Sequence, residues 1–265
     1  MKHIELNSNK KVYFASDFHL GAPNPMESRT REYKVIEWLN YIQKDAQVIF
    51  LVGDIFDFWF EYKKVVPKGF VRIQAKIAEL VEQGIEVYFF LGNHDMWMKS
   101  YFSEELGVKM IENELEVKIN NKTFYISHGD GLGPGDYGYK FIKKIFRNRV
   151  CQFLFSLLHP SMGLSLANYF SKRSRASSGK KDESFTKKEN EWLYQFCIEK
   201  LKERDIDFFV FGHRHLPMEI SINSSKYFNL GEWMNYQTFA EFDGEDQKLF
   251  SWKNGKIEIF KGIQL

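Results

Sequence analysis

Short apolar runs alternate with amphipathic stretches over the first hundred residues of the chain. The runs at Lys11–Ser16, Val48–Gly53 and Ile85–Gly92 are rich in β-branched or aromatic residues and end in turn residues, which is typical of buried strands. Between them, Arg31–Lys44 and Phe70–Gln83 place apolar residues at helical spacing. This alternation of strands and helices predicts an α/β fold whose first sheet is largely parallel.

The second half of the chain is richer in strands. Glu114–Ile119 and Lys122–Ser127 flank Asn120-Asn121, which suits a tight hairpin turn. After a helical middle part, Asp207–Gly212 has the pattern of another buried strand. Five further short runs are predicted to be antiparallel strands: Met218–Ile222, Lys226–Leu230, Thr238–Phe242, Lys248–Trp252 and Lys256–Phe260. We expect two packed sheets with helices outside, within a single domain over residues 1–265.

Composition excludes several classes of protein. The two cysteines, Cys151 and Cys197, are too few for a disulfide scaffold or a cysteine-based zinc site. The N-terminus has no apolar signal-peptide region, and no apolar run approaches the roughly 20 residues that cross a bilayer. These features favour a reducing, cytoplasmic setting. Aromatic residues make up 17% of the chain.

The net charge of +2 hides an uneven distribution. Residues 137–188 hold 12 Lys and Arg against two Asp and Glu, a net charge of +10, which leaves −8 for the rest of the chain. We therefore expect an anionic partner for this segment.

Five polar motifs come directly after predicted buried strands. They are Ser16–His19, Gly53–Asp57, Gly92–Asp95, Ser127–Asp130 and Gly212–His215, and they contain five of the seven histidines. The carboxyl ends of strands in an α/β sheet converge on a crevice where ligands bind. Alone, Asp-x-His is more often a turn, Gly-Asp after a strand is common, and only His-x-His has some specificity for a site. Five such motifs in this order indicate a shared site.

The residue types in these motifs indicate a metal site. Carboxylate, imidazole and amide oxygen form a mixed ligand set that suits Mn, Fe, Zn or Co better than Ca or Mg. Asp17 and His19 are two residues apart, so an extended segment points both to one side. Asp54 is central enough to bridge two cations, and seven candidate ligands suit two ions better than one. Asp95 and Asp130 fit supporting or turn roles better than a ligand role.

The order of the motifs resembles the calcineurin-like metallophosphoesterase family, whose pattern is D-x-H, GDxxD, GNH[DE], a later H and GHxH. The resemblance implies a β-sandwich flanked by helices. It also implies one metal ion held by Asp17, His19, Asp54 and His215, and a second held by Asp54, Asn93, His128 and His213. The cofactors would be two divalent ions, most simply Mn, with Fe or Zn as alternatives.

The resemblance also assigns catalytic roles. Two cations about 3.5–4 Å apart lower the pKa of a bridging water toward ~7, and the resulting hydroxide attacks phosphorus in line. His94 is the candidate for contacting the phosphoryl group or protonating the leaving group. In the family, the second Asp of GDxxD, here Asp57, orients that histidine. The alternative interpretation of Asp57 is a helix N-cap.

A closer resemblance is to the UDP-2,3-diacylglucosamine diphosphatases of lipid A biosynthesis. It rests on residues 16–21, 53–59 and 128–136 and on a helical insertion after Asp136. It implies hydrolysis of UDP-2,3-diacylglucosamine to UMP and 2,3-diacylglucosamine 1-phosphate. Some of these enzymes have Arg where this chain has His94. The candidate substrate contacts are Asp136, Tyr139, Ser174, Lys180 and Lys181; the alternative for the lysines is plain surface charge.

The insertion, residues 137–188, combines apolar and basic residues. Phe141, Ile142, Ile145 and Phe146 recur at helical spacing, with Lys140, Lys143, Lys144 and Arg147 on another face. Phe153, Leu154, Leu157 and Leu158 continue the apolar stripe, which we expect Pro160 to stop. One interpretation is a helix packed on the main domain with a solvated basic face. The other, which the resemblance favours, is an amphipathic lid on an anionic membrane surface that admits acyl chains.

Three functions therefore remain open. The first is a cytoplasmic pyrophosphatase, peripherally associated with the inner membrane, that cleaves a UDP-lipid. The second is a soluble metallophosphoesterase acting on nucleotides, phosphoproteins or other phosphodiesters. The third is a nucleic-acid binding protein or nuclease, which the apolar stripe of the insertion disfavours.

Overall fold

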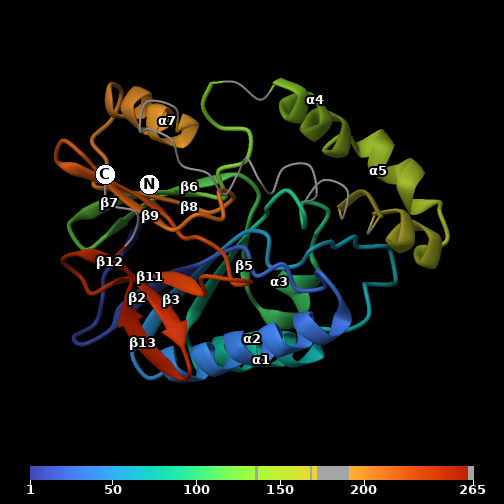
Figure 1. The fold of residues 1–265 in the computed structure, drawn as a ribbon, viewed down its shortest axis with the longest axis horizontal. Helices are drawn as coiled ribbons and strands as arrows, with labels where there is room; N and C mark the ends of the chain where they lie inside the picture. Colours follow the sequence, from blue (N-terminus) through green and yellow to red (C-terminus); the bar gives the residue numbers. More distant parts are fainter. Residues whose placement is uncertain (135–136, 168, 172–190, 262–265) are drawn as a thin grey trace.

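Two β-sheets pack face to face, with helices on their outer faces, in the computed structural model (Figure 1). The structure describes residues 1–134, 137–167, 169–171 and 191–261. The predicted α/β sandwich flanked by helices is confirmed.

The seven-stranded sheet contains the first strands of the chain. In spatial order it runs β13 (Lys256–Ile259), β12 (Gln247–Lys253), β11 (Thr238–Phe242), β2 (Lys11–Ala15), β3 (Ala46–Val52), β4 (Glu86–Phe90) and β5 (Lys109–Ile111). Strands β2 to β5 are parallel neighbours, with Phe14 opposite Phe50 and Phe50 opposite Tyr88. The C-terminal strands extend the sheet in antiparallel fashion. The predicted parallel first sheet is therefore confirmed for β2 to β5.

The six-stranded sheet holds most of the second half of the chain. Its order is β1 (Lys2–Ile4), β6 (Glu114–Ile119), β7 (Lys122–Ser127), β8 (Phe208–Phe211), β10 (Ser225–Asn229) and β9 (Met218–Ile222). The hairpin predicted at Asn120 is present between β6 and β7. The prediction that all strands after residue 212 are antiparallel is wrong for β10, which lies between β8 and β9 and is parallel to β8.

Helices cover both outer faces. The seven-stranded sheet packs against α1 (Pro25–Ile42), α2 (Val71–Glu82) and α3 (Tyr101–Leu106), and the six-stranded sheet packs against α7 (Trp192–Leu201) (Figure 1). Helix α1 begins six residues before the predicted start, because the Asn24 side chain accepts hydrogen bonds from the backbone N–H groups of Met26 and Glu27. Pro25 at the first helical position is compatible with that start.

Aromatic side chains fill the space between the two sheets. The ring of Phe14 lies 5.1 Å from that of Phe50 and 5.8 Å, across the sandwich, from that of Phe124. All three side chains are fully buried. Alternation along each strand sends one set of side chains into this layer, and burying them supplies much of the stability of the sandwich.

The insertion begins with two short helices, α4 (Tyr137–Phe146) and α5 (Arg149–Ser156), followed by helical backbone at 160–167 and 169–171. The expectation of one stripe ending at Pro160 is wrong. Asn148 caps a new helix, since its side chain accepts from two backbone N–H groups of α5, and Pro160 begins the next helical stretch. No residue of α4 or α5 is buried, and both helices lie outside the sandwich (Figure 1). None of the described helices has the length and apolar character needed to cross a membrane.

Candidate metal centre

The carboxyl ends of strands from both sheets meet at one edge of the sandwich. Asp17, Asp54 and Asn93 follow β2, β3 and β4 of one sheet, while His128 and His213 follow β7 and β8 of the other. Two hydrogen bonds tie the strand ends together: the amide of Asp17 donates to the Gly53 carbonyl over 3.0 Å, and His128 Nδ1 lies 2.9 Å from the Val52 carbonyl oxygen. The convergence predicted from the motif order is present.

Five of the seven predicted ligands have a left-handed backbone. Their φ angles are 55° for Asp17, 44° for His19, 55° for Asp54, 67° for His213 and 54° for His215. Residues other than glycine rarely adopt this region, and each such residue costs about 1–3 kcal/mol. Such strain collects where the positions of side chains are under functional constraint.

The first predicted ligand set is assembled around Asp17. Its Oδ1 lies 3.3 Å from His215 Nε2 and 3.6 Å from His19 Nε2, and the two Nε2 atoms are 3.0 Å apart. The Asp54 Oδ2 atom lies 3.9 Å from His19 Nε2. Donor atoms from three loops therefore lie close together, and those of Asp17, His19 and His215 all lie within 4.8 Å of one another.

The second predicted set lies on the other side of Asp54. Its Oδ2 is 3.3 Å from His128 Nε2, and Asn93 Oδ1 is 3.2 Å from the same nitrogen. Asn93 Oδ1 also lies 2.9 Å from His213 Nδ1. The Val52 carbonyl only accepts, so His128 carries hydrogen on Nδ1 and keeps Nε2 for a metal. Asp54 thus lies between the two sets, as a bridging ligand must.

The donor atoms present fit divalent cations. Asp17 Oδ1 is fully buried and has no hydrogen-bond partner, which is costly for a carboxylate unless a cation meets it. Three overlapping groups of donor atoms lie within 4.8 Å of one another, namely Asp17–His19–His215, His19–Asp54–His94 and Asp17–Asp54–His128. Imidazole and carboxylate together match Mn, Fe or Zn.

The electrostatics of the site agree with a cationic occupant. Burial alone would raise the pKa of Asp17, but the neighbouring imidazoles of His19 and His215 hold it well below its usual value. Burial lowers the pKa of His19 and of His213 to about 4, so both imidazoles are neutral at pH 7. Burial opposes a charge on His128, yet Asp54 outweighs it and raises the pKa of His128 to about 10. Metal binding at such a site releases the proton.

Asp95 holds the loops rather than facing the donor atoms. Its Oδ1 accepts from the Gly92 amide at 2.8 Å, and its Oδ2 accepts from the Ile55 amide at 2.9 Å. Burial is the main cause and repulsion from Asp54 the second cause that raise the pKa of Asp95 to about 7. The loop after β4 is thereby fixed against the loop after β3. This arrangement supports the expectation that Asp95 plays a supporting role.

A Gly92→Ala variant is expected to lose metal binding. A Cβ at this position would lie 2.2 Å from Asp54 Oδ1 and 2.5 Å from the Asp54 backbone nitrogen, so the bridging carboxylate would have to move. We expect fewer than one bound ion per chain by elemental analysis and turnover reduced at least about 100-fold. Gly138→Ala is the matched control, because nothing lies within 4 Å of its added Cβ. Two ions retained in Gly92→Ala would contradict the close approach seen here.

His94 and Asp57 lie beside the first ligand set. The His94 ring centroid is 4.9 Å from that of His19. His94 Nδ1 lies 2.9 Å from the Asp57 carbonyl oxygen, whereas the nearest Asp57 carboxylate oxygen is 3.8 Å away. The partner expected from the family was the carboxylate, but the direct hydrogen bond runs to the backbone. Ser171, which the sequence did not single out, places its Oγ 3.0 Å from Asp57 Oδ2 and 3.3 Å from His94 Nδ1.

Of the predicted substrate contacts, only Tyr139 lies in the described part of the chain. Its ring centroid is 6.1 Å from that of His213, and its hydroxyl donates to Asp130 Oδ2 over 2.6 Å. Burial and the neighbouring Asp130 raise the pKa of Tyr139, so the hydroxyl keeps its proton. Asp136, Ser174, Lys180 and Lys181 lie outside the described residues.

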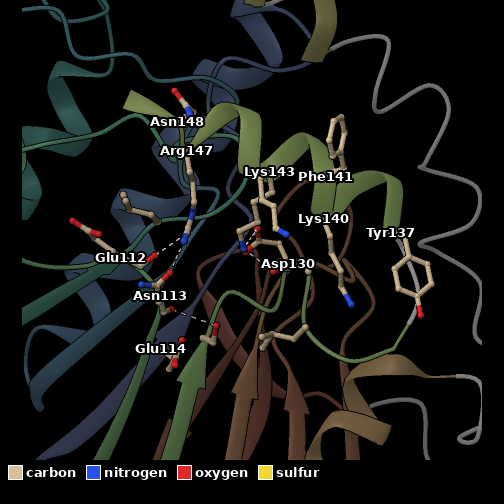
Figure 2. A pocket seen from close by; sticks show the side chains of 15 residues that line it. Glu112, Asn113, Glu114, Asp130, Tyr137, Lys140, Phe141, Lys143, Arg147 and Asn148 are labelled. Carbon is tan, nitrogen blue, oxygen red and sulfur yellow. Dashed lines mark hydrogen bonds and ion pairs between the residues drawn. The ribbon is translucent and has the colours of Figure 1, made fainter. Parts of the chain in front are cut away.

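A pocket of about 660 Å³ opens beside these residues, between α4 and the ends of β4 and β7 (Figure 2). Lys143 of α4 pairs with Asp130 over 2.5 Å, and Arg147, directly after α4, donates to Asn113, so two basic side chains reach back to the sandwich (Figure 2). Lys140 and Lys144 also line the pocket. The basic face predicted for this helix therefore lines this pocket.

Arg31 of α1 is a supporting residue that sequence reasoning missed. Its guanidinium donates to the carbonyl oxygens of Phe18, His19 and Ala22 at 2.5–2.6 Å. These carbonyls belong to the loop in which Asp17 and His19 have positive φ. The helical spacing placed Arg31 in a helix, but nothing in that pattern showed that the helix would face this loop.

Comparison with known proteins points to one family. The sequence model of the calcineurin-like phosphoesterase family matches residues 10–217. A UDP-2,3-diacylglucosamine hydrolase of Porphyromonas gingivalis is 36% identical over 247 residues, covering 88% of this chain and 94% of the relative. A protein of the same name from Yersinia pseudotuberculosis is 25% identical, covering 83% of this chain and 90% of the relative.

Solved structures are similar at lower identity. An archaeal phosphodiesterase shares 14% identity with a TM-score of 0.47, covering 90% of this chain and 98% of that chain. A phosphoesterase from E. coli shares 16% identity with a TM-score of 0.46, covering 93% of this chain and 96% of that chain.

Proposed function

Because this chain belongs to the calcineurin-like phosphoesterase family and is 36% identical to a UDP-2,3-diacylglucosamine hydrolase, we propose that it cleaves the pyrophosphate of UDP-2,3-diacylglucosamine. The products would be UMP and 2,3-diacylglucosamine 1-phosphate. The observation that carries this substrate is the 36% identity to a hydrolase of that name over 94% of its length. The five site motifs follow strand ends at one edge of the sandwich, and the side chains that supply the chemistry gather there in three overlapping groups: Asp17, His19, Asp54, His94, His128 and His215.

The residues divide into two roles. Asp17, Asp54 and their imidazole and amide neighbours would hold two divalent ions, which we propose to be Mn²⁺, with Fe or Zn fitting the same donors. When bound, such ions supply a Lewis acid and a nucleophile at neutral pH. His94 lies beside this set with its Nδ1 engaged by Asp57, so its Nε2 is the nitrogen available to a phosphoryl or leaving-group oxygen.

The pocket under α4 supports an anionic substrate. Lys140, Lys143, Lys144 and Arg147 line it, and Asp130 connects it to the loop that carries His128. Cationic side chains next to a reacting diphosphate stabilise its charge. Phe141 is also among the lining residues, but its ring points away from the Lys140 side chain (Figure 2).

The test compares two substrates on the same Mn-loaded protein. We expect release of UMP from UDP-2,3-diacylglucosamine with a kcat/KM at least 100-fold above that for a generic aryl phosphodiester. The EDTA-treated protein should lose both activities. Turnover of the aryl substrate without release of UMP would overturn the substrate and leave a metallophosphoesterase of another specificity.

We also propose that the insertion docks the protein on an anionic membrane surface, from the cytoplasmic side of the inner membrane. In α4, α5 and the helical backbone after them, large apolar side chains are 58–66% exposed, namely Phe141, Val150, Phe153, Leu154, Leu157 and Met162. Basic residues of the same helices, Lys140, Lys144 and Arg149 among them, would meet acidic headgroups. An acyl substrate resides at such a surface.

A Phe153→Glu variant tests this surface. Its side chain is 62% exposed, and inserting a Phe side chain into a membrane is worth about 1.5–3 kcal/mol. We therefore expect at least a tenfold loss of sedimentation with phosphatidylglycerol vesicles and no change in metal content. Ile259→Glu, which charges an equally exposed apolar residue on β13, is the control and should sediment as the unmodified protein does. Equal sedimentation of both variants with the vesicles would show that the insertion does not contact the membrane.

A further inference from the structure

The hydroxyl of Ser171 bridges the two groups assigned to catalysis. Its Oγ is 3.0 Å from Asp57 Oδ2 and 3.3 Å from His94 Nδ1. Ser171 is 8% exposed, whereas its neighbours Tyr169 and Phe170 are more than half exposed. It is 114 residues from Asp57 in the sequence, so this contact joins the insertion to the loop after β3. The contact belongs to the tertiary fold and not to a local turn.

Chemistry fixes the direction of these hydrogen bonds. A carboxylate only accepts, so the Ser171 hydroxyl donates to Asp57 Oδ2. The Asp57 carbonyl also only accepts, so His94 Nδ1 carries hydrogen and donates to it over 2.9 Å. A lone pair of Ser171 Oγ then faces the same N–H. The Asp57 carbonyl oxygen and the Ser171 hydroxyl oxygen thus both lie next to His94 Nδ1. The tautomer with hydrogen on Nδ1 leaves Nε2 for the substrate.

The serine compensates for a gap between carboxylate and imidazole. Asp57 Oδ1 is 3.8 Å from His94 Nδ1, too far for a direct hydrogen bond. Through Ser171, the negative charge of Asp57 stays connected to the imidazole by two hydrogen-bonding contacts. An imidazole held in this way is better oriented than one that contacts a carbonyl alone.

The insertion that carries Ser171 is seated on the sandwich by aromatic contacts. The ring centroid of Phe155 in α5 lies 4.7 Å from that of Phe60 and 4.8 Å from that of Trp97. The Trp97 indole N–H donates to the Phe146 carbonyl of α4 over 2.7 Å. The insertion therefore contacts the sandwich at two places, through α4 and α5 at Phe60 and Trp97 and through Ser171 at Asp57 and His94.

We propose that Ser171, which the insertion contributes, is a positioning residue that orients His94 through Asp57. The proposal rests on the role given to His94 in the proposed function, but not on the identity of the substrate. It predicts that removing the hydroxyl slows turnover through His94 alone.

The experiment compares Ser171→Ala, Ser171→Thr and Ser165→Ala in the Mn-loaded full chain. Thr keeps the hydroxyl. Ser165 lies in the same helical region, and its Oγ bonds only a local carbonyl, that of Ser161, among the contacts seen in the described residues. For Ser171→Ala we expect kcat to fall about tenfold on an aryl phosphodiester, with KM within twofold and two ions still bound. Thr should restore at least half of the lost kcat, and Ser165→Ala should behave as the unmodified protein.

A double variant separates positioning from general structural damage. If Ser171 acts through His94, adding Ser171→Ala to His94→Ala should change kcat by less than twofold. A further tenfold loss in the double variant, a failure of Thr to rescue, or an unchanged kcat in Ser171→Ala would each overturn the proposal. Hydrolysis of the aryl substrate needs the candidate metal centre and His94 but not the UDP-lipid. Failure of the Ser171 proposal is therefore distinguishable from a failure to release UMP from the UDP-lipid.

Discussion

Replacing Asp54 by Asn is expected to abolish binding of both metal ions and to lower kcat/KM by at least about 1,000-fold. Its carboxylate is 1% exposed, with Oδ2 3.3 Å from His128 Nε2 and 3.9 Å from His19 Nε2. The Asn side chain keeps the size of Asp but loses the charge that two cations would share. Asp54 Oδ1 accepts a hydrogen bond from the His94 amide at 2.8 Å, so the neutral side chain also weakens that loop contact.

Metal content by elemental analysis checks this prediction. Asp45→Asn is the control, since Asp45 accepts from the Tyr13 hydroxyl just before β3, at the opposite end of that strand. It should retain two ions and full turnover. One ion retained in Asp54→Asn would place Asp54 in a single ligand set, and two retained ions would rule it out as the bridging ligand.

Replacing His94 by Ala is expected to lower kcat by about 100- to 10,000-fold while leaving both ions bound. The side chain is 13% exposed, and its Nδ1 faces the Asp57 carbonyl rather than a shared donor point. General acid–base groups contribute rate without contributing metal affinity, so kcat should fall far more than metal content. A stopped assay for kcat and elemental analysis on the same preparation make the comparison.

His3→Ala is the control for this variant. His3 lies near the start of the chain and pairs with Glu5 over 3.4 Å, and its loss should change neither quantity. The alternative role for His94 is that of a metal ligand, because its donor atom lies within 4.8 Å of those of His19 and Asp54. Loss of one ion in His94→Ala would move His94 from the catalytic group into the ligand shell.

The grouping of the candidate metal ligands was predictable because it depends on strand ends. Once β2, β3 and β4 are recognised as adjacent parallel strands, Asp17, Asp54 and Asn93 must lie at one edge, whatever the details of packing. The order of the motifs then matched a family pattern. The register of the strands and the positive φ angles refine this arrangement but do not change which residues meet.

Other features were not accessible from periodicity. Strands β1 and β5 have three residues each, too few for an alternating pattern, and they form by pairing with longer neighbours. The helical stripe of the insertion looked continuous in apolar spacing, yet the Asn148 cap divides it. No pattern in the sequence indicated Ser171, because its position depends on a tertiary contact with Asp57, which is 114 residues away.

The exposure of the apolar side chains distinguishes the two interpretations of the insertion, a helix packed on the main domain or an amphipathic lid on a membrane. A helix packed on the main domain would bury its apolar stripe, but no residue of α4 or α5 is buried. Phe155 and Phe146 contact Trp97, while Phe153 and Leu157 remain more than 60% exposed. Exposed apolar residues grouped on one segment mark an interaction surface, which supports the membrane proposal.

The most direct test of the account is a metal titration of the chelator-stripped protein, monitored by release of UMP from UDP-2,3-diacylglucosamine. If two ions share Asp54, activity should be low with one equivalent of Mn²⁺ and should rise to its plateau only as the second equivalent binds. Full release of UMP with a single equivalent, or without added metal, would contradict a two-ion phosphohydrolase built on these strand ends.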